Sequence, residues 1–318
     1  MFGDCFGTRD REILDITLFS DKMNEEQLSI IKQNLMKTFR YMVAFFEKHG
    51  IGYCGAYGTV IGAARHKGFI PWDDDLDIHM QRADYDKLLT LRAEMRNDGY
   101  DIVSLNDEGY YLPFAKIVDL NTTIWELKQL PFVMGNYIDI FPLDCFSLTD
   151  SELEAMRKLA RKLFYRYQPC ITANEGLGNL FKHLAHRELG SAYRIMMSPF
   201  NRSKAKAERR LRKYNDFVNS KIGQSGDKCV YIPSGMKAVF KTEWFENLIT
   251  VPFEDTEIVI PAKYDEYLTS LYGDWRTPPP VSQQNATHGN VRYYMNLREG
   301  LTLEQVKERM ETGEHLVL

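Results

Sequence analysis

A cluster of acidic side chains lies in residues 68–78, which read Gly-Phe-Ile-Pro-Trp-Asp-Asp-Asp-Leu-Asp-Ile. Because side chains alternate faces along a strand, we expect Asp75 and Asp77 to point the same way, with Leu76 and Ile78 turned into the fold. Two neighbouring carboxylates repel each other, and a hard divalent ion with oxygen ligands, such as Mg²⁺, compensates them. The apolar neighbours disfavour the alternative, a solvated acidic turn. The segment therefore predicts a metal site.

A further acidic residue stands between apolar neighbours in Tyr-Ile-Asp-Ile-Phe, residues 137–141. A buried carboxylate between two isoleucines is costly without a cation or a hydrogen-bonding partner. If this expected strand lies beside the first, Asp139 completes a site of three carboxylates. Asp144, three residues beyond this run, is a weaker candidate, because a turn or a helix cap explains it equally well.

The pair Gly58-Thr59 precedes a short expected helix. A small residue, a hydroxyl and the free backbone N–H groups of a helix start are the usual means of receiving a phosphate. Alone, the pair is a weak signal. An Asp-x-Asp strand follows about 16 residues later. That order matches the layout of nucleotidyltransferase-fold enzymes, in which a glycine turn holds phosphate and carboxylates hold metal.

Read as a whole, residues 57–78 resemble the signature of the LicD family. This family comprises phosphocholine transferases of bacterial surface glycans and is related to the fukutin-type phosphoribitol transferases. Further pieces that resemble the family are residues 114–119, Thr122, Thr123, residues 137–144, residues 272–275, Pro278, Pro279 and His288. The resemblance covers roughly residues 24–144 and resumes near Tyr231.

The resemblance implies an α/β (α+β) fold, with a nucleotidyltransferase-like mixed sheet flanked by helices, a helical insertion and a C-terminal segment. It also implies dependence on Mg²⁺ or Mn²⁺, and CDP-choline or another CDP-alcohol as donor. By position, Gly58 and Thr59 belong to the phosphate turn, Asp75 and Asp77 to the metal pair, and Asp139 is the third carboxylate.

Five further residues are candidates for donor or phosphate binding. The basic run Arg65, His66 and Lys67 is positioned to meet donor phosphates, although basic residues after a short helix also interact with its last carbonyls. Lys116 is either a phosphate contact or a surface strand lysine. His288 is either a site residue or an ordinary loop histidine.

The expected reaction is transfer of phosphocholine to a hydroxyl of a bacterial surface glycan of the lipopolysaccharide, capsule or teichoic acid type, with release of CMP. One alternative transfers phosphoethanolamine or phosphoribitol from the CDP donor. Another is a true nucleotidyltransferase that uses an NTP. A third is a non-catalytic glycan-binding protein. Intact Asp75, Asp77 and Asp139 argue against this last alternative.

Three regions are expected to position these residues. Residues 1–148 form a nucleotidyltransferase-like core with an N-terminal helix, residues 149–225 form a helical, basic region, and residues 226–318 form a C-terminal segment that completes the same catalytic unit. Hydrophobic periodicity and short apolar runs predict the elements of these regions. The expected helices cover residues 24–49, 84–97, 149–168, 204–218 and 264–272, and the expected strands cover residues 51–56, 100–105, 111–118, 122–127, 137–141, 250–253 and 257–260.

The totals describe an ordinary globular chain, with 44% hydrophobic residues and a net charge of -4. This charge gives no bulk attraction to nucleic acid, so no nucleic-acid partner is expected. Five distant cysteines without a Cys-x-x-Cys pair favour a reducing cytoplasm. No signal peptide or membrane span is expected. The basic run Lys204–Lys213 is either a solvated helix face or a peripheral contact with the anionic inner face of the membrane.

Overall fold

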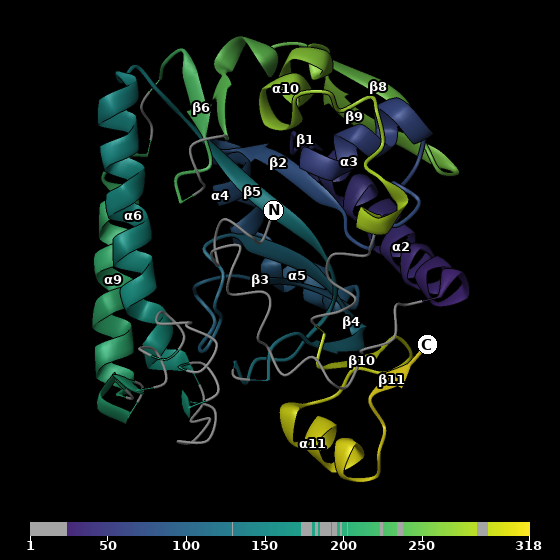
Figure 1. Ribbon diagram of the computed structural model, residues 1–318, viewed down its shortest axis with the longest axis vertical. Helices are drawn as coiled ribbons and strands as arrows, with labels where there is room; N and C mark the ends of the chain where they lie inside the picture. Colours follow the sequence, from purple (N-terminus) through teal and green to yellow (C-terminus); the bar gives the residue numbers. More distant parts are fainter. Residues whose placement is uncertain are drawn as a thin grey trace.

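A mixed sheet of nine strands forms the centre of the protein, with helices packed around it (Figure 1). The computed structural model describes residues 24–318 except 129, 173–179, 182–183, 185–191, 193–195, 198, 202, 223–224, 234–237 and 285–291. The strands of the sheet are β1 (Cys54–Gly55), β2 (Asp77–Gln81), β3 (Tyr100–Val103), β4 (Ala115–Trp125), β5 (Met134–Phe146), β6 (Lys228–Val230), β7 (Val239–Lys241), β10 (Tyr294–Asn296) and β11 (Leu316–Val317). The expected mixed α/β fold is confirmed.

The long strand β5 organises the sheet, because it pairs with β2 in parallel and with β4 and β6 in antiparallel orientation. The spatial order is β1-β2-β5-β4-β10-β11, with β3 also paired to β4 and β7 paired to β6. A separate hairpin joins β8 (Leu248–Phe253) to β9 (Thr256–Pro261), and these strands confirm those expected at residues 250–253 and 257–260. Neighbouring strands of the central sheet therefore come from both ends of the described chain.

Helix α2 (Glu25–His49) packs against β4 and β5 and confirms the first expected helix. Asn24 forms a capping box with Gln27, and Gly50 ends the helix with φ 58°. The buried face consists of apolar residues at helical spacing, including Ile31, Leu35, Phe39, Met42 and Phe46. The periodic pattern thus predicted both the helix and the face that it buries.

The remaining helices surround the sheet and follow the sequence less closely. They are α3 (Tyr57–Ile61), the π-helical turn η1 (Gly62–His66), α4 (Arg82–Thr90), α5 (Arg92–Asn97), α6 (Asp150–Ile171), α9 (Lys204–Asn219), the 3₁₀ turns η2 (Thr242–Trp244) and η3 (Val281–Gln283), α10 (Tyr264–Tyr272) and α11 (Leu303–Glu311). The prediction of a single helix at residues 84–97 is wrong, because the helix is interrupted at Leu91, between α4 and α5. The two strands expected at 111–118 and 122–127 are one strand, β4, with a register shift between Asp119 and Ile124.

Helices α6 and α9 lie side by side at one edge of the molecule (Figure 1). Their shared core contains Leu153, Phe164 and Tyr214 from the helices together with Phe146 and Val230 from the sheet. The expected helical region is therefore packed onto the end of β5. Among the described residues, no helix is both long and apolar enough to cross a membrane.

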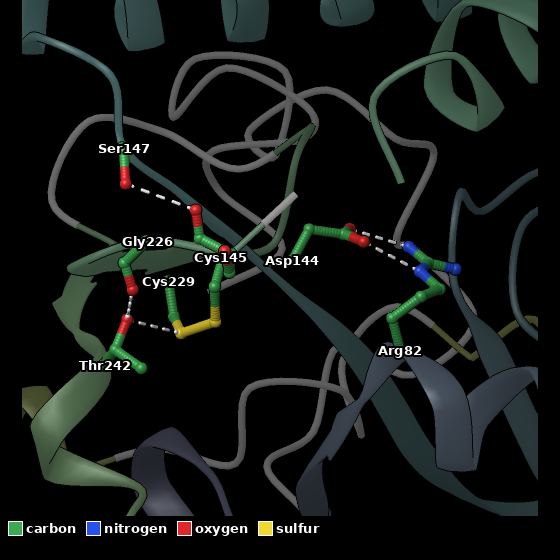
Figure 2. The surroundings of a disulfide bond; sticks show 8 residues. Arg82, Asp144, Cys145, Ser147, Gly226, Cys229 and Thr242 are labelled. Atoms are coloured by element: carbon green, nitrogen blue, oxygen red, sulfur yellow. Dashed lines mark hydrogen bonds and ion pairs between the residues drawn. A yellow bond between two sulfur atoms is a disulfide. The ribbon is translucent and has the colours of Figure 1, made fainter. Parts of the chain in front are cut away.

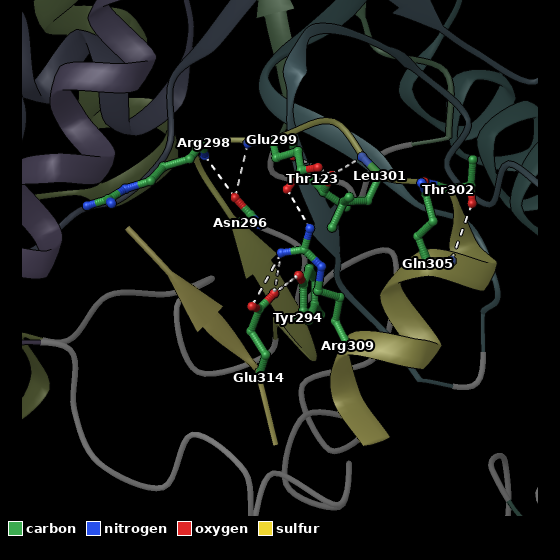
Figure 3. Close-up of polar contacts among 10 residues, drawn as sticks. All are labelled: Thr123, Tyr294, Asn296, Arg298, Glu299, Leu301, Thr302, Gln305, Arg309 and Glu314. Atoms are coloured by element: carbon green, nitrogen blue, oxygen red, sulfur yellow. Dashed lines mark hydrogen bonds and ion pairs between the residues drawn. The ribbon is translucent and has the colours of Figure 1, made fainter. Parts of the chain in front are cut away.

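The C-terminal residues are tied to the sheet by Thr123 of β4 (Figure 3). Its hydroxyl donates to the Glu299 carbonyl at 2.8 Å and accepts from the Leu301 N–H at 2.7 Å. The side chain of Asn296 accepts from the N–H groups of Arg298 and Glu299. These bonds fix the turn that leads from β10 to α11.

A disulfide joins Cys145 of β5 to Cys229 of β6, which are direct cross-strand neighbours although 84 residues apart in sequence (Figure 2). Beside it, Asp144 accepts two hydrogen bonds from Arg82, at 2.8 and 2.7 Å. The spacing of the cysteines along the sequence did not reveal that these two residues are strand neighbours.

Replacing both Cys145 and Cys229 with serine is expected to lower the free energy of unfolding by about 2–4 kcal/mol, because the cross-link closes a long loop in the unfolded chain. Urea unfolding without reductant measures the loss. Cys170→Ser, at a free cysteine, is the matched control and should unfold like the wild type. Two reactive thiols at positions 145 and 229 in the native, air-exposed protein would contradict the expectation.

Candidate active site

The strand register brings Asp77 and Asp139 together. Asp77 of β2 is the direct partner of Asp139 in the parallel neighbour β5, and the Asp139 N–H donates to the Leu76 carbonyl at 3.0 Å. Both side chains are buried, and so are the flanking apolar residues Ile78 and Ile138. The condition set by the sequence, that the two acidic strands lie side by side, is confirmed. Two carboxylates thus emerge side by side on adjacent strands.

Asp75 precedes β2, which begins at Asp77, so the expected placement of Asp75 on the same strand is wrong. It is half-buried, as is Asp73. Tyr272, at the end of α10, lies near this group: desolvation, followed by the charges of Asp77, Asp73 and Asp75, raises the pKa of its phenol. The acidic cluster therefore has an aromatic neighbour from a distant segment of the chain.

Asp74 has a different role from the other carboxylates. It is fully buried and accepts a hydrogen bond from Arg292 at 3.1 Å, while the Asp74 carbonyl accepts another from the same guanidinium at 3.4 Å. Burial alone would lower the pKa of Arg292, but the charge of Asp74 raises it above its ordinary value. Asp74 therefore anchors the acidic segment to the C-terminal region.

Two further side chains hold the loop that leads into the acidic cluster. Lys32 of α2 donates to the carbonyls of Ile70 and Pro71, at 3.0 and 2.9 Å. Glu254, in the β8–β9 turn, accepts from the Phe69 N–H at 2.8 Å. Neither residue lies in a recognisable motif, so neither could be identified from the sequence. They come from elements far from the loop along the chain.

Lys116 is completely buried, so the alternative of a surface strand lysine is wrong. Its ammonium group lies 2.6 Å from Asp139 Oδ1 and 3.3 Å from the centre of the Tyr137 ring. The strand register explains the contact, because Lys116 of β4 is the direct partner of Asp139. Lys116 thus fixes one oxygen of the candidate third carboxylate.

The Gly58-Thr59 turn is bonded directly to the strand that carries Asp77. The Thr59 hydroxyl accepts from the Asp77 N–H at 2.8 Å. A side chain at Gly58 would approach the Asp73 carboxylate to 3.1 Å. The turn that begins α3 and the acidic segment therefore face each other across a short distance.

Of the four other candidate residues, Arg65 and His66 lie together. Arg65 donates to His66 Nε2 at 2.9 Å and to the Trp275 carbonyl at 2.6 Å. Burial, and the positive charges of Arg65 and Lys32, lower the pKa of His66. Lys67 is exposed. His288 lies outside the described residues.

The chemistry of this donor set fits a divalent metal ion, although no group of three or more His, Cys, Asp or Glu poised to hold one occurs in the described part of the chain. Tyr137 links a group of buried charges, since its ring contacts Lys116 and Arg292 and its hydroxyl donates to Glu126. In this group carboxylates outnumber cations: Asp74, Asp77, Glu126, Asp139, Lys116 and Arg292. Carboxylate oxygens are the ligands that a hard divalent cation prefers.

Comparison with known proteins adds a family match and several relatives. Residues 50–162 match the family described as LicD/FKTN/FKRP, nucleotidyltransferase domain. The lipopolysaccharide cholinephosphotransferase LicD of Haemophilus influenzae is 26% identical over 281 residues, which are 85% of this chain and 100% of that protein. The mouse ribitol 5-phosphate transferase FKRP is 40% identical over 59 residues, which are 19% of this chain and 12% of that protein. An uncharacterised protein of Rickettsia prowazekii is 31% identical over 187 residues, which are 58% of this chain and 65% of that protein.

Proposed function

We infer the function of this chain from the premise that it belongs to the LicD family, whose nucleotidyltransferase domain matches residues 50–162. The chain is a phosphotransferase that acts on a bacterial glycan, in keeping with the Haemophilus cholinephosphotransferase that aligns with most of it. We propose that it moves phosphocholine from CDP-choline to a hydroxyl of a bacterial surface glycan and releases CMP. The observation that carries the proposal is the cross-strand pair of Asp77 and Asp139 beside the Gly58-Thr59 turn.

In the proposed reaction, a glycan hydroxyl attacks the choline-bearing phosphorus, the bond from that phosphorus to the oxygen of CMP breaks, and a phosphodiester remains. Alignment and electrostatic stabilisation are the main demands of such a transfer. A divalent cation held by Asp75, Asp77 and Asp139, when bound, neutralises the diphosphate and the leaving group. Mg²⁺ or Mn²⁺ fits these oxygen ligands.

The other side chains of the candidate site bind the donor, orient a carboxylate or accept a proton. Arg65 and His66, with Lys67 and the Gly58-Thr59 turn, meet the phosphates of the donor. Lys116 holds Asp139 Oδ1, which orients that carboxylate either as a metal ligand or as the acceptor of the hydroxyl proton. Thr59 keeps the turn at a fixed distance from Asp77 through its bond to the strand backbone.

A choline cation favours an aromatic surround. Tyr110, Tyr111, Trp125 and Trp275 are buried, whereas Trp72 is half-buried and directly precedes the acidic residues Asp73 to Asp75. Trp72 is therefore our candidate contact for the choline group. Phosphoethanolamine and phosphoribitol remain the alternative donor groups, the second because the mouse relative is a ribitol 5-phosphate transferase.

A true nucleotidyltransferase would use the same fold to move NMP from an NTP. The released product separates the two reactions. The proposed transferase releases CMP when it is given CDP-choline, Mg²⁺ and a glycan acceptor. An NTP-dependent enzyme releases pyrophosphate when it is given an NTP, and it releases no product from CDP-choline. Binding of CDP-alcohols without turnover of any of them would favour the glycan-binding alternative.

We also propose that residues 226–318 complete the catalytic unit formed by residues 1–148, with the helical region 149–225 packed at its edge. This assignment is supported by the strands β6, β7, β10 and β11, which join the central sheet, and by the bond from Arg292 to Asp74. The helical region offers a separate contact surface. On α9, Lys204, Arg209, Arg212 and Lys213 are exposed.

Reversing the charge of Arg209, Arg212 and Lys213 together is expected to weaken association with anionic phospholipid vesicles by roughly 10²-fold, since each basic residue near such a surface contributes about 1 kcal/mol. Vesicle co-sedimentation at low ionic strength measures the change. The matched control reverses three exposed basic residues on other elements, Lys128, Arg298 and Lys307, and should bind like the wild type. Equal binding of the α9 variant would remove the proposed membrane contact.

A further inference from the structure

The backbone at Tyr57, immediately before the Gly58-Thr59 turn, adopts a conformation that few residues other than glycine adopt. Its φ is 47°, in the left-handed region that side chains with a Cβ rarely occupy. The Tyr57 side chain is buried. Such a conformation persists only where the surrounding structure holds it in place. Some contact must therefore fix the backbone at the start of α3.

The Tyr57 N–H donates to the hydroxyl of Tyr267 at 2.9 Å. The same hydroxyl lies 3.0 Å from Nε2 of His79. Either group can donate in this second contact, according to which ring nitrogen of His79 carries the proton. Tyr267 thus bridges the backbone of the turn and a side chain of β2, two residues beyond Asp77.

The bridge is buried and rigidly packed. Tyr267 and His79 are almost completely shielded from solvent. Aromatic rings surround the imidazole, namely Tyr57, Phe141, Phe240, Phe245 and Tyr267. Since water is excluded, removal of the Tyr267 hydroxyl would leave both the Tyr57 N–H and His79 Nε2 without that partner.

The bridge comes from outside the domain that matches the family. Tyr267 lies in α10, about 100 residues beyond the matched range 50–162. Helix α10 packs directly on α3 (Figure 1). A second bond, from Arg65 to the Trp275 carbonyl, holds the chain that follows α10 at the end of η1. The C-terminal segment thus contacts both ends of the turn-and-helix unit.

We propose that Tyr267 is a positioning residue, whose hydroxyl locks the Gly58-Thr59 turn onto β2 and so sets the distance between that turn and Asp77. The importance of this distance for turnover rests on the proposed function, whereas the locking itself does not. Thr59 forms the second link between the same two elements, through its bond to the Asp77 N–H. Two hydrogen bonds therefore hold the turn, one made by Thr59 of the turn itself and one made by Tyr267 of α10.

Tyr267→Phe tests the proposal, because it removes only the hydroxyl and keeps the ring. Hydrogen exchange followed by mass spectrometry should show exchange about tenfold faster or more in peptides that contain residues 57–60, since the amide of Tyr57 loses its partner. The initial rate of CMP release at saturating donor should fall by roughly 10–10²-fold, since small misplacements at a reacting site have effects of this size.

Tyr167→Phe is the matched control. Its hydroxyl also makes one buried hydrogen bond, to the Tyr110 carbonyl at 2.9 Å, but lies in α6. This variant should show wild-type exchange in residues 57–60 and wild-type turnover. It therefore separates a general loss of stability from a local effect on the turn.

A double-mutant cycle with Thr59→Ala adds a readout that a purely structural role would not move. If both residues act on the same turn, the fold-loss of turnover in the double variant is smaller than the product of the fold-losses in the two single variants. Unchanged exchange in residues 57–60 of Tyr267→Phe would overturn the proposal, and so would faster exchange with wild-type turnover. If Tyr267→Phe exchanges faster but the wild type itself releases no CMP, the result would support the locking and overturn the proposed function.

Discussion

Replacing Asp77 with alanine will reduce the rate of the proposed phosphocholine transfer by about 10³-fold or more, because a metal ion bound by this residue would stabilise the transition state by several kcal/mol. The fold should survive. Asp77 is buried beside Asp139, so its removal relieves repulsion between like charges. We therefore expect the free energy of unfolding without metal to stay equal or to rise. Asp75→Ala should have an effect on transfer of the same kind.

The measurement is the initial rate of CMP release with Mg²⁺, together with urea unfolding in the presence of EDTA. Asp86→Ala is a suitable control, because this carboxylate is exposed and forms only a weak pair with Arg82 at 3.6 Å. It should transfer at the wild-type rate. Near-normal transfer by a folded Asp77→Ala variant would show that this residue does not hold the metal.

Replacing Lys116 with methionine will lower the free energy of unfolding by about 3–5 kcal/mol, the usual cost of removing one partner from a buried ion pair. The ammonium group is completely buried and lies 2.6 Å from the buried Asp139. Its removal leaves the carboxylates of Asp139 and Asp77 side by side with less positive charge. Mg²⁺ should restore part of the loss if it binds at these carboxylates.

Urea unfolding of Lys116→Met with EDTA and with Mg²⁺ measures both effects. Lys204→Met removes an ion pair of similar length, 2.9 Å, but an exposed one. Its loss should be below about 1 kcal/mol. The double variant Lys116→Met/Asp139→Asn should recover much of the stability, because it no longer buries the Asp139 charge. A single variant as stable as the wild type would contradict a stabilising role for the pair.

The sequence predicted features of the candidate site that depend on a single segment, apart from the placement of Asp75, which lies before β2. The alternation of Asp77 with Leu76 and Ile78, and the apolar flanks of Asp139, predicted buried acidic strands, because one sheet face must meet the core. The adjacency of the two strands could be stated only as a condition, because register between distant strands depends on the whole sheet. The same holds for Lys116, whose partner is set by the pairing of β4 with β5.

Contacts made by distant elements escaped prediction for a different reason. Lys32, Glu254 and Arg292 each hold the acidic segment through hydrogen bonds to it. Isolated charged residues of this kind occur on every solvated surface, so no local pattern distinguishes an anchor from an ordinary surface charge. The break between α4 and α5 at Leu91 was missed for a related reason, since the apolar periodicity continues across it.

The most direct test of the central claim is the mass of a bacterial surface glycan after incubation with the protein, CDP-choline and Mg²⁺. We predict that the glycan gains the mass of one phosphocholine group for each CMP released, and that EDTA prevents both changes. A glycan of unchanged mass, with no CMP released, while another CDP-alcohol or an NTP is consumed under the same conditions, would contradict the claim.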